Sequence, residues 1–136
     1  MCGKKIMLFF GHRFIESQDF YHVSDIESIK NTPPSSTIYL SFSEDNLDII
    51  KHLQSNQLSF GLRALNIEQI MYASSLGASF IVVSEDLAKS AQNIANNYLF
   101  DAKILVKIKD EDEIEELAIL GVDGVIFSNA IIKTNS

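Results

Sequence analysis

The sequence is poor in cysteine and in long apolar runs, and these shortages argue against a disulfide-stabilised protein and against a membrane-spanning one. Cys2 is the single cysteine among 136 residues, so no disulfide can form within the chain and a reducing cytoplasm is predicted. No apolar stretch approaches the roughly 20 residues that cross a bilayer. The run Ile6–Phe10 after Lys4 and Lys5 is shorter than the roughly 7 to 15 apolar residues of a secretory signal, and a buried strand is predicted there instead.

Positive charge is also scarce. The chain has 11 lysine and arginine residues against 18 aspartate and glutamate residues, which gives a formal net charge of −7. A surface with this balance repels polyphosphate and lacks the basic patch of a nucleic-acid-binding protein. Neither nucleic acid nor a membrane is therefore expected as a partner.

The residues that are present suffice for one hydrophobic core. Hydrophobic residues make up 46% of the sequence and charged residues 21%, which is ordinary for a globular protein, and 136 residues is close to the usual size of one domain. We expect a single domain over residues 1–136. Residues 1–36 form an irregular front segment that ends in the sequence TPPSS, and residues 37–130 form regular strand–helix units.

A repeated pattern defines these units: a short β-branched or aromatic run, a polar break, an amphipathic stretch, and a Gly or Asn exit. Helices are predicted to begin near Glu44, Ile67, Glu85 and Asp112, with Ser43, Asn66, Ser84 and Asp110 as capping residues. A weaker helix is predicted over Asp25–Lys30. The predicted strands are Ile6–Phe10, Phe20–Val23, Ile38–Phe42, Leu58–Leu62, Phe80–Val83, Lys103–Ile108 and Gly124–Phe127.

Internal similarity favours a barrel geometry. Residues 60–83 resemble residues 104–127: Gly77 matches Gly121, an offset of 121 − 77 = 44, and Arg63 matches Lys107 at the same offset. Because strands such as Phe80–Val83 are apolar without alternation, we predict an α/β fold of parallel βα repeats, a reduced or half TIM-type barrel. The predicted strands are fewer than the eight of a full barrel, and an open barrel leaves strand edges to cover, so a homodimer is expected.

Ligands of parallel βα folds bind at the carboxyl ends of the strands, which selects the candidate site residues. His12 and Arg13 follow the first strand and are the candidate catalytic residues, because an imidazole beside a guanidinium suits phosphate esters. Arg63 and Lys107 are candidate ligand-binding residues that could face a common centre. The other interpretation of these two is that they are rim charges, solvated or paired with acidic neighbours. Ser128 and Asn129, after the last strand, complete the set.

No metal or cofactor motif is visible. The three histidines are scattered, Cys2 has no nucleophile context, and glycine-rich phosphate loops are absent. The acidic run Asp110–Glu113 opens a helix, where carboxylates favour the positive end of the dipole, so it is predicted to stabilise the helix rather than bind a cation. No metal and no cofactor are therefore expected.

One family resemblance is carried by the carboxyl half of the chain. The sequence ILVKIKDEDEIEELAILGVDGVIF over Ile104–Phe127, together with IYLSFSEDNL over Ile38–Leu47, resembles the barrel of the glycerophosphodiester phosphodiesterases, and the likeness covers about Thr37 to Ala130. His12–Arg13 is similar to the pair that opens the active site of that family. The Gly-Val-Asp-Gly ending is shared loosely with the tryptophan synthase α-subunit and with keto-deoxy-phosphogluconate aldolases.

The resemblance implies phosphodiester hydrolysis with a divalent cation held by carboxylates, but Phe14 replaces the glycine that should follow the pair, and the carboxylate motifs of the family are not recognisable. The leading hypothesis is therefore a non-hydrolytic binding or assembly protein that takes an anionic or phosphate-bearing small molecule at the strand carboxyl ends. The alternatives are a hydrolase whose site is completed by dimerisation, and a purely structural subunit.

Overall fold

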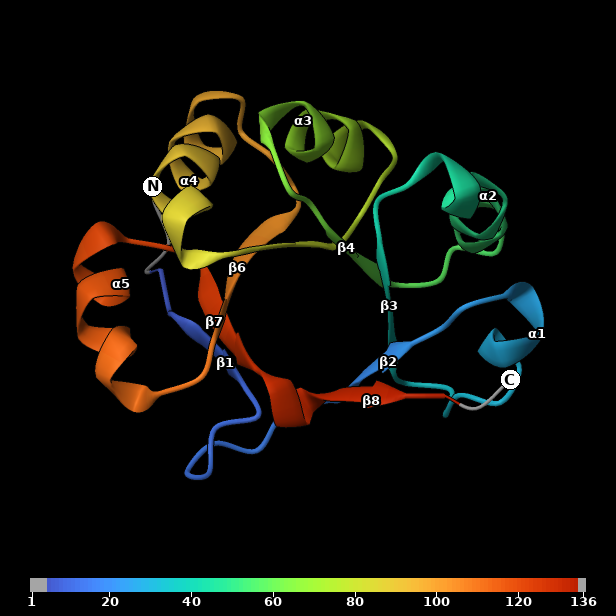
Figure 1. Cartoon of the computed structure of the whole chain (residues 1–136), viewed down its shortest axis with the longest axis horizontal. Coiled ribbons are helices and arrows are strands. Elements are labelled where there is room, and N and C mark those ends of the chain that lie inside the picture. The colour runs from blue at the N-terminus through green and yellow to red at the C-terminus, as the bar shows by residue number, and fades with distance from the viewer. Residues whose placement is uncertain (1–4, 135–136) are drawn as a thin grey trace.

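A computed structural model describes residues 5–134, so Cys2 and Lys4 lie outside the described residues. These residues form an α/β fold in which eight parallel strands curl into a reduced barrel, with the helices on the outside (Figure 1). The strand order in the sheet is β1-β7-β6-β5-β4-β3-β2-β8. The predicted fold class is confirmed. In the described part of the chain, every helix is too short or too polar to cross a membrane.

Each helix follows a strand and packs against the outer face of the sheet. The helices are α1 (Ile26–Ile29), α2 (Leu47–Ser55), α3 (Ile67–Ser75), α4 (Ala88–Asn97) and α5 (Ile114–Leu120), and the 3-10 turns are η1 (Glu44–Asn46), η2 (Glu85–Leu87), η3 (Glu111–Glu113) and η4 (Ser128–Ala130). The strands are β1 (Leu8–Phe10), β2 (Phe20–His22), β3 (Thr37–Ser41), β4 (Phe60–Arg63), β5 (Phe80–Val83), β6 (Lys103–Ile108), β7 (Gly124–Phe127) and β8 (Ile131–Lys133).

The last segment of the chain joins the two ends of the curled sheet. Strand β7 pairs with β1 and β6, the turn η4 follows it directly, and β8 then pairs with β2. Two hydrogen bonds from Thr134 to the His22 carbonyl oxygen, 3.2 Å from the backbone N–H and 3.0 Å from the hydroxyl, extend the β2–β8 contact. The two sides of the curled sheet are therefore connected by one continuous stretch, residues 124–133, while β1 and β8 remain the ends of the strand order.

Strand β8 was not predicted, and it raises the strand count from seven to eight. Its signal, Ile131-Ile132-Lys133, is shorter than the runs that identified the other strands. The barrel is small because two of its connections lack a helix: the β1–β2 loop is irregular, and β7 leads to β8 through the single turn η4.

Element boundaries differ from the prediction by a few residues. Strand β4 begins at Phe60 rather than Leu58, and β1 begins at Leu8 rather than Ile6. The chain forms a 3-10 turn before each of α2, α4 and α5, so these α-helices begin about one turn later than expected.

The capping residues are mostly as predicted. The Asn66 side chain accepts a hydrogen bond from the Gln69 N–H at 2.9 Å, and Asp110 forms a capping box with Glu113. Ser84 makes no such cap, because its hydroxyl bonds to Asp86 instead. The internal repeat is visible in the backbone, since Gly77 and Gly121 follow their helices with φ of +87° and +85°, a conformation that glycine adopts without steric cost.

The sheet is packed on both faces. Helices cover the outer face, where Leu62, Ile81 and Val106 belong to the larger core. Inside the ring a second cluster contains Phe10, Phe20, Tyr39, Val82, Leu105, Ile126 and Ala130, with Phe80 packed against it. The rings of Phe10, Phe20 and Phe80 lie 5.1 to 5.5 Å apart, centroid to centroid, in T-shaped and tilted contacts. The ring therefore encloses a solid core rather than a channel.

The Gly-Val-Asp-Gly sequence that carries the family resemblance lies at the amino end of β7, where its residues hold β7 against the neighbouring strands. Asp123 accepts a hydrogen bond from the Ile104 N–H at 2.8 Å and pairs with Lys5 at 3.3 Å. Gly124 lies against β1, where an added Cβ would stand 2.7 Å from both the Cβ and the carbonyl oxygen of Leu8. The motif supports the barrel at the end opposite to the strand carboxyl ends.

Substitution Gly124→Ala should destabilise the protein, because the new methyl group has to displace backbone and side-chain atoms of Leu8. Overpacking of this kind costs about 1 to 3 kcal/mol of unfolding free energy. The measurement is the midpoint of urea unfolding followed by circular dichroism. Gly121→Asn is the matched control, since no atom lies within 4 Å of a Cβ there and Asn tolerates positive φ. Equal midpoints for wild type and Gly124→Ala would contradict the close packing.

Candidate functional site

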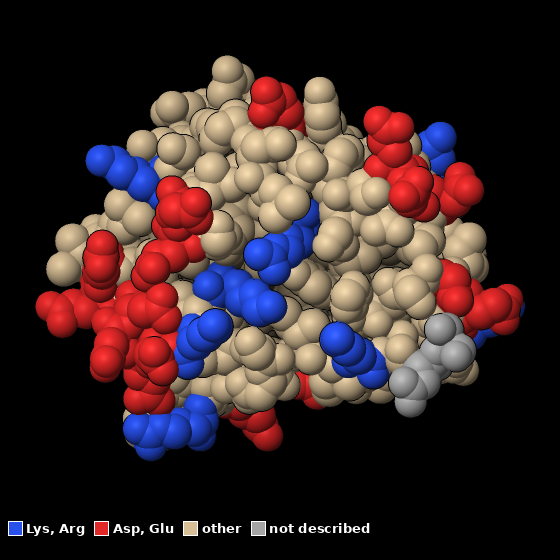
Figure 2. Space-filling model, viewed as in Figure 1, with Lys and Arg blue, Asp and Glu red and all other residues tan. Residues whose placement is uncertain are grey.

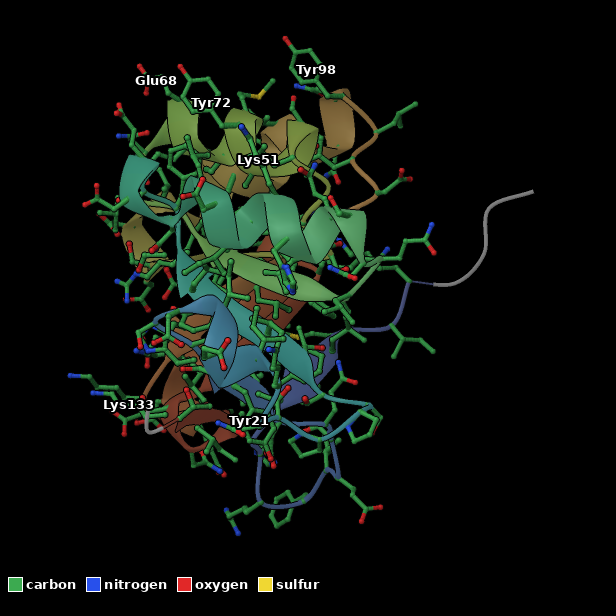
Figure 3. All side chains as sticks on the ribbon, turned by 90° about the vertical axis from the view of Figure 1, so that its right-hand side faces the viewer. Tyr21, Lys51, Glu68, Tyr72, Tyr98 and Lys133 are labelled. Atoms are coloured by element: carbon green, nitrogen blue, oxygen red, sulfur yellow. The ribbon has the colours of Figure 1, made fainter. Side chains whose placement is uncertain are left out.

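The carboxyl ends of the strands meet on the face that is turned to the viewer in Figures 1 and 2. Lys133, the last residue of β8, projects from this face, which is seen edge-on at the left of Figure 3. In Figure 2 a row of lysine and arginine side chains crosses the middle of the face, and acidic side chains gather beside it over the α5 region. A protein of net charge −7 thus has a basic centre at the position where βα folds bind ligands.

The first hollow on this face contains the two basic residues matched by the internal repeat. It has a volume of about 460 Å³ and is lined by Arg63, Ser84, Glu85, Lys107, Ile108, Lys109, Asp110 and Glu113. We call it the Lys107 hollow. Arg63 and Lys107 are both half-buried residues near the ends of β4 and β6. The structure brings this predicted pair together.

The hollow has a basic inner side and an acidic outer side. Arg63 and Lys107 come from the strands, whereas Glu85, Asp110 and Glu113 come from the turns outside them. The ion pairs formed between residues 5 and 134 include neither Arg63 nor Lys107, so of the two forms of the rim-charge interpretation the structure shows the solvated one and not the paired one. Both cations remain available to an anion.

The acidic side is itself internally bonded. The Glu113 carboxylate accepts backbone N–H groups of Asp110 and Lys109, each at 3.1 Å, and these bonds hold the pKa of Glu113 below its usual value. A hydrogen bond to Glu113, and the charge of that carboxylate, raise the pKa of Glu85. Glu113 is therefore engaged with the η3 turn, and Glu85 gains a proton more readily than an ordinary glutamate.

A second hollow adjoins the first and shares Lys109 and Asp110 with it. It has a volume of about 360 Å³, and we call it the His12 hollow; its lining is Gly11, His12, Arg13, Lys109, Asp110, Glu111, Phe127 and Asn129. The two predicted catalytic residues and Asn129 therefore lie beside the Lys107 hollow rather than in it. Ser128, in η4, is exposed and lines neither of these two hollows.

Both ring nitrogens of His12 have partners. The Phe14 N–H donates to Nδ1 at 3.1 Å, so the ring proton resides on Nε2, which lies 3.1 Å from a Glu111 carboxylate oxygen. The His12 side chain is only 8% exposed, and its ring packs against Phe9 and Phe127. These contacts fasten the β1–β2 loop to the β6–α5 connection.

Arg13 joins the same cluster from outside. Its Nε and Nη2 atoms donate to the two oxygens of Glu111 at 2.8 and 3.2 Å, and its guanidinium lies 4.1 Å from the centroid of the Phe14 ring. The hydrogen bond from Arg13 lowers the pKa of Glu111, and that bond with Glu111 raises the pKa of Arg13. Asn129 donates to the Gly11 carbonyl oxygen at 2.9 Å, so it also holds the β1–β2 loop.

Two residues that sequence reasoning did not select, His22 and Lys133, also lie at the mouth of the barrel, which is the opening of the curled sheet at the strand carboxyl ends. His22, at the end of β2, is paired in register with Lys133 on β8 and with Tyr39 on β3, and the His22 and Tyr39 rings lie 5.4 Å apart. Lys133 could not be found without β8. The alternation within β2 carried a signal for His22, since Phe20 is buried inside the ring and His22 lies two residues further on the same face.

The protonation of His22 and Tyr39 reflects the basic mouth. Burial lowers the pKa of His22, and the positive charges of Lys133 and Lys107 lower it further. Burial raises the pKa of Tyr39, while the neighbouring Arg63 opposes that shift. His22 is therefore held toward its neutral form, and Tyr39 keeps its hydroxyl proton.

Comparison with protein-family models and with curated proteins finds no match for this chain. The fold defines the class: a reduced parallel βα barrel with a basic mouth at the strand carboxyl ends. Among residues 5–134, no group of three or more His, Cys, Asp or Glu side chains is placed to hold a metal ion.

The low pKa of His22 predicts a loss of stability in mild acid. Below the ordinary histidine value of 6.5 the unfolded chain binds a proton that the folded His22 resists, so the free energy of unfolding falls as the pH drops toward the lower folded pKa. His22→Gln should remove this part of the pH dependence. The measurement is urea unfolding between pH 7.5 and pH 5, with His52→Gln on helix α2 as the control. A pH dependence unchanged by His22→Gln would contradict the shift.

Proposed function

We propose that the chain is a non-hydrolytic binding protein for an anionic small molecule, of the phosphate-bearing class, which binds at the carboxyl ends of the strands. The observation that carries the proposal is the convergence of Arg63 and Lys107 on one hollow, where no carboxylate of residues 5–134 is in ion-pair contact with either. The Ser84 hydroxyl lines the same hollow but donates its hydrogen to Asp86, so the two cations carry the proposal.

Charge distribution supports an anion over a cation. The chain carries −7 overall, so a free anion is repelled from most of the surface and attracted to the basic mouth (Figure 2). A guanidinium can bind a phosphate through two parallel hydrogen bonds, and an ammonium adds a point charge. At an effective dielectric constant of about 20, two unit charges 4 Å apart attract by about 4 kcal/mol before the costs of desolvation and association are subtracted.

The bonding of His12 supports binding without hydrolysis. A general acid or base needs a ring nitrogen within reach of the reacting group. In His12, Nδ1 accepts the Phe14 N–H and Nε2 faces Glu111, so neither nitrogen points into the hollow with a free position. The His12–Arg13 pair that resembles a phosphodiesterase motif fits the role of a structural clamp.

A second candidate function is a phosphodiester hydrolase, and it rests on the adjacency of the two hollows. Lys109 and Asp110 line both, so an ester whose phosphate binds Arg63 and Lys107 would extend toward His12. Hydrolysis would require His12 to leave Glu111, with the rest of the site completed by a second copy of the chain.

We also propose that the working form is a cytoplasmic homodimer. The single cysteine is the basis for the location. For the dimer, the basis is the sheet itself, because β1 and β8 stand at the two ends of the strand order and each pairs with one strand, β7 and β2 respectively. Light scattering of the purified protein measures the mass directly.

The test of the proposed function is a thermal-unfolding series with inorganic phosphate and glycerol 1-phosphate. Binding to the folded state should raise the unfolding free energy by about 2.7 kcal/mol at a ligand concentration one hundred times the dissociation constant. Arg63→Gln and Lys107→Gln should each remove most of the shift, because each deletes one cation of the pair.

Lys51→Gln is the matched control, since Lys51 is an exposed lysine on α2, on the outside of the barrel (Figure 3). Equal shifts in wild type and in both hollow variants would contradict the proposed site. Hydrolysis of a glycerophosphodiester that disappears in His12→Ala would favour the second candidate over the first.

A further inference from the structure

The basic mouth extends beyond the Lys107 hollow to the opposite side of the ring. Strands β2 and β8 are neighbours, and the register places His22 beside Lys133. Lys133 is exposed, and the ion pairs between described residues do not include it. This side of the mouth therefore holds a further cation that pairs with no carboxylate among residues 5–134.

The two sides belong to one continuous surface. Strands β4, β3, β2 and β8 are successive neighbours in the sheet, and the register places His22 beside Tyr39 and Lys133. The positive charges of Lys133 and Lys107 both lower the pKa of His22. His22 contacts Tyr39, and Tyr39 in turn lies next to Arg63. Arg63, Tyr39, His22 and Lys133 thus line an arc around the mouth, and Lys107 is close enough to this arc to act on His22.

The surroundings decide in which direction a bound molecule extends. Outward from Arg63 and Lys107 lies the acidic wall of Glu85, Asp110 and Glu113, which repels a second negative group. Toward the interior of the barrel, the packed rings of Phe10, Phe20 and Phe80 occupy the space below the strand carboxyl ends, so a bound molecule does not extend in that direction. The direction that remains favourable to an anion runs across the mouth, toward His22 and Lys133.

We propose that the ligand carries two anionic groups, the first held by Arg63 and Lys107 and the second held by Lys133 with His22 across the mouth of the barrel. The chemical class is a small molecule with two phosphates, or with a phosphate and a carboxylate. This inference rests on the proposed function, because it adds a second anion subsite to the first.

His22 gives the second subsite a dependence on pH. A bound anionic group stabilises the imidazolium form and offsets the charges of Lys133 and Lys107, so binding is coupled to proton uptake. The groups that face His22 are Lys133, Lys107 and Tyr39, and Tyr39 stays protonated over this range. A ligand that reaches His22 therefore binds more tightly at pH 6 than at pH 8. This difference is additional to the effect of pH on the ionisation of the ligand itself.

The experiment compares inorganic phosphate with inorganic pyrophosphate by isothermal titration calorimetry on the full chain. Wild type should bind pyrophosphate at least tenfold more tightly than phosphate. Lys133→Ala should reduce that preference by about tenfold, while leaving phosphate affinity within about twofold. Lys51→Ala removes the same charge from the outside of the barrel and should leave both affinities unchanged. His22→Gln should abolish the extra gain in pyrophosphate affinity at pH 6, with methylenebisphosphonate as a second probe of different ionisation.

The outcomes separate the two proposals. Binding of phosphate with no preference for pyrophosphate, or a preference that Lys133→Ala leaves intact, overturns the second subsite and preserves the first. No binding of either anion, in a folded protein, overturns both. A preference lost in Lys133→Ala but kept in Lys51→Ala, together with weaker binding of both anions in Lys107→Gln, supports both subsites.

Discussion

The packing of aromatic rings inside the small barrel is the constraint on which the other features depend. Phe10, Phe20 and Phe80 come from three different strands, and their edge-to-face and tilted contacts fill the ring. Space for them is provided at Gly61, where an added Cβ would stand 3.4 Å from both Phe20 and Phe80. Because the interior is solid, polar residues on the inner face of the strands can lie only at the ends, and chemistry is confined to the mouth.

The residues that stabilise the barrel and the residues of the candidate site therefore lie at opposite ends of the strands. On β7, Asp123 and Gly124 fix the amino end through contacts with β6 and β1. On β4 and β6, the carboxyl ends present Arg63 and Lys107 above the aromatic layer. The Gly-Val-Asp-Gly sequence thus belongs to the part of the barrel that supports the strands, at the end opposite to the candidate site.

Much of the fold could be predicted because apolar runs, capping residues and the repeated glycines all act locally. Arg63 and Lys107 could also be predicted as candidate site residues, since the internal repeat placed them at equivalent strand ends. Lys133 was not found because β8 was not predicted, and the proximity of Lys133 to His22 depends on the pairing of β2 with β8, which joins residues more than a hundred positions apart. The bonding of His12 was equally hidden, because Glu111 was assigned to helix stabilisation and not to a partner across the chain.

The closing segment also constrains how the protein reaches its native state. Strands β3 to β6 pair with their neighbours in sequence order, so their contacts can form as the chain emerges during synthesis. Strands β1 and β2 have to wait for β7 and β8, the last part of the chain, before they gain those partners. The front of the chain therefore lacks part of its hydrogen bonds until β7 and β8 have been made, and Lys133 can join His22 only after that point.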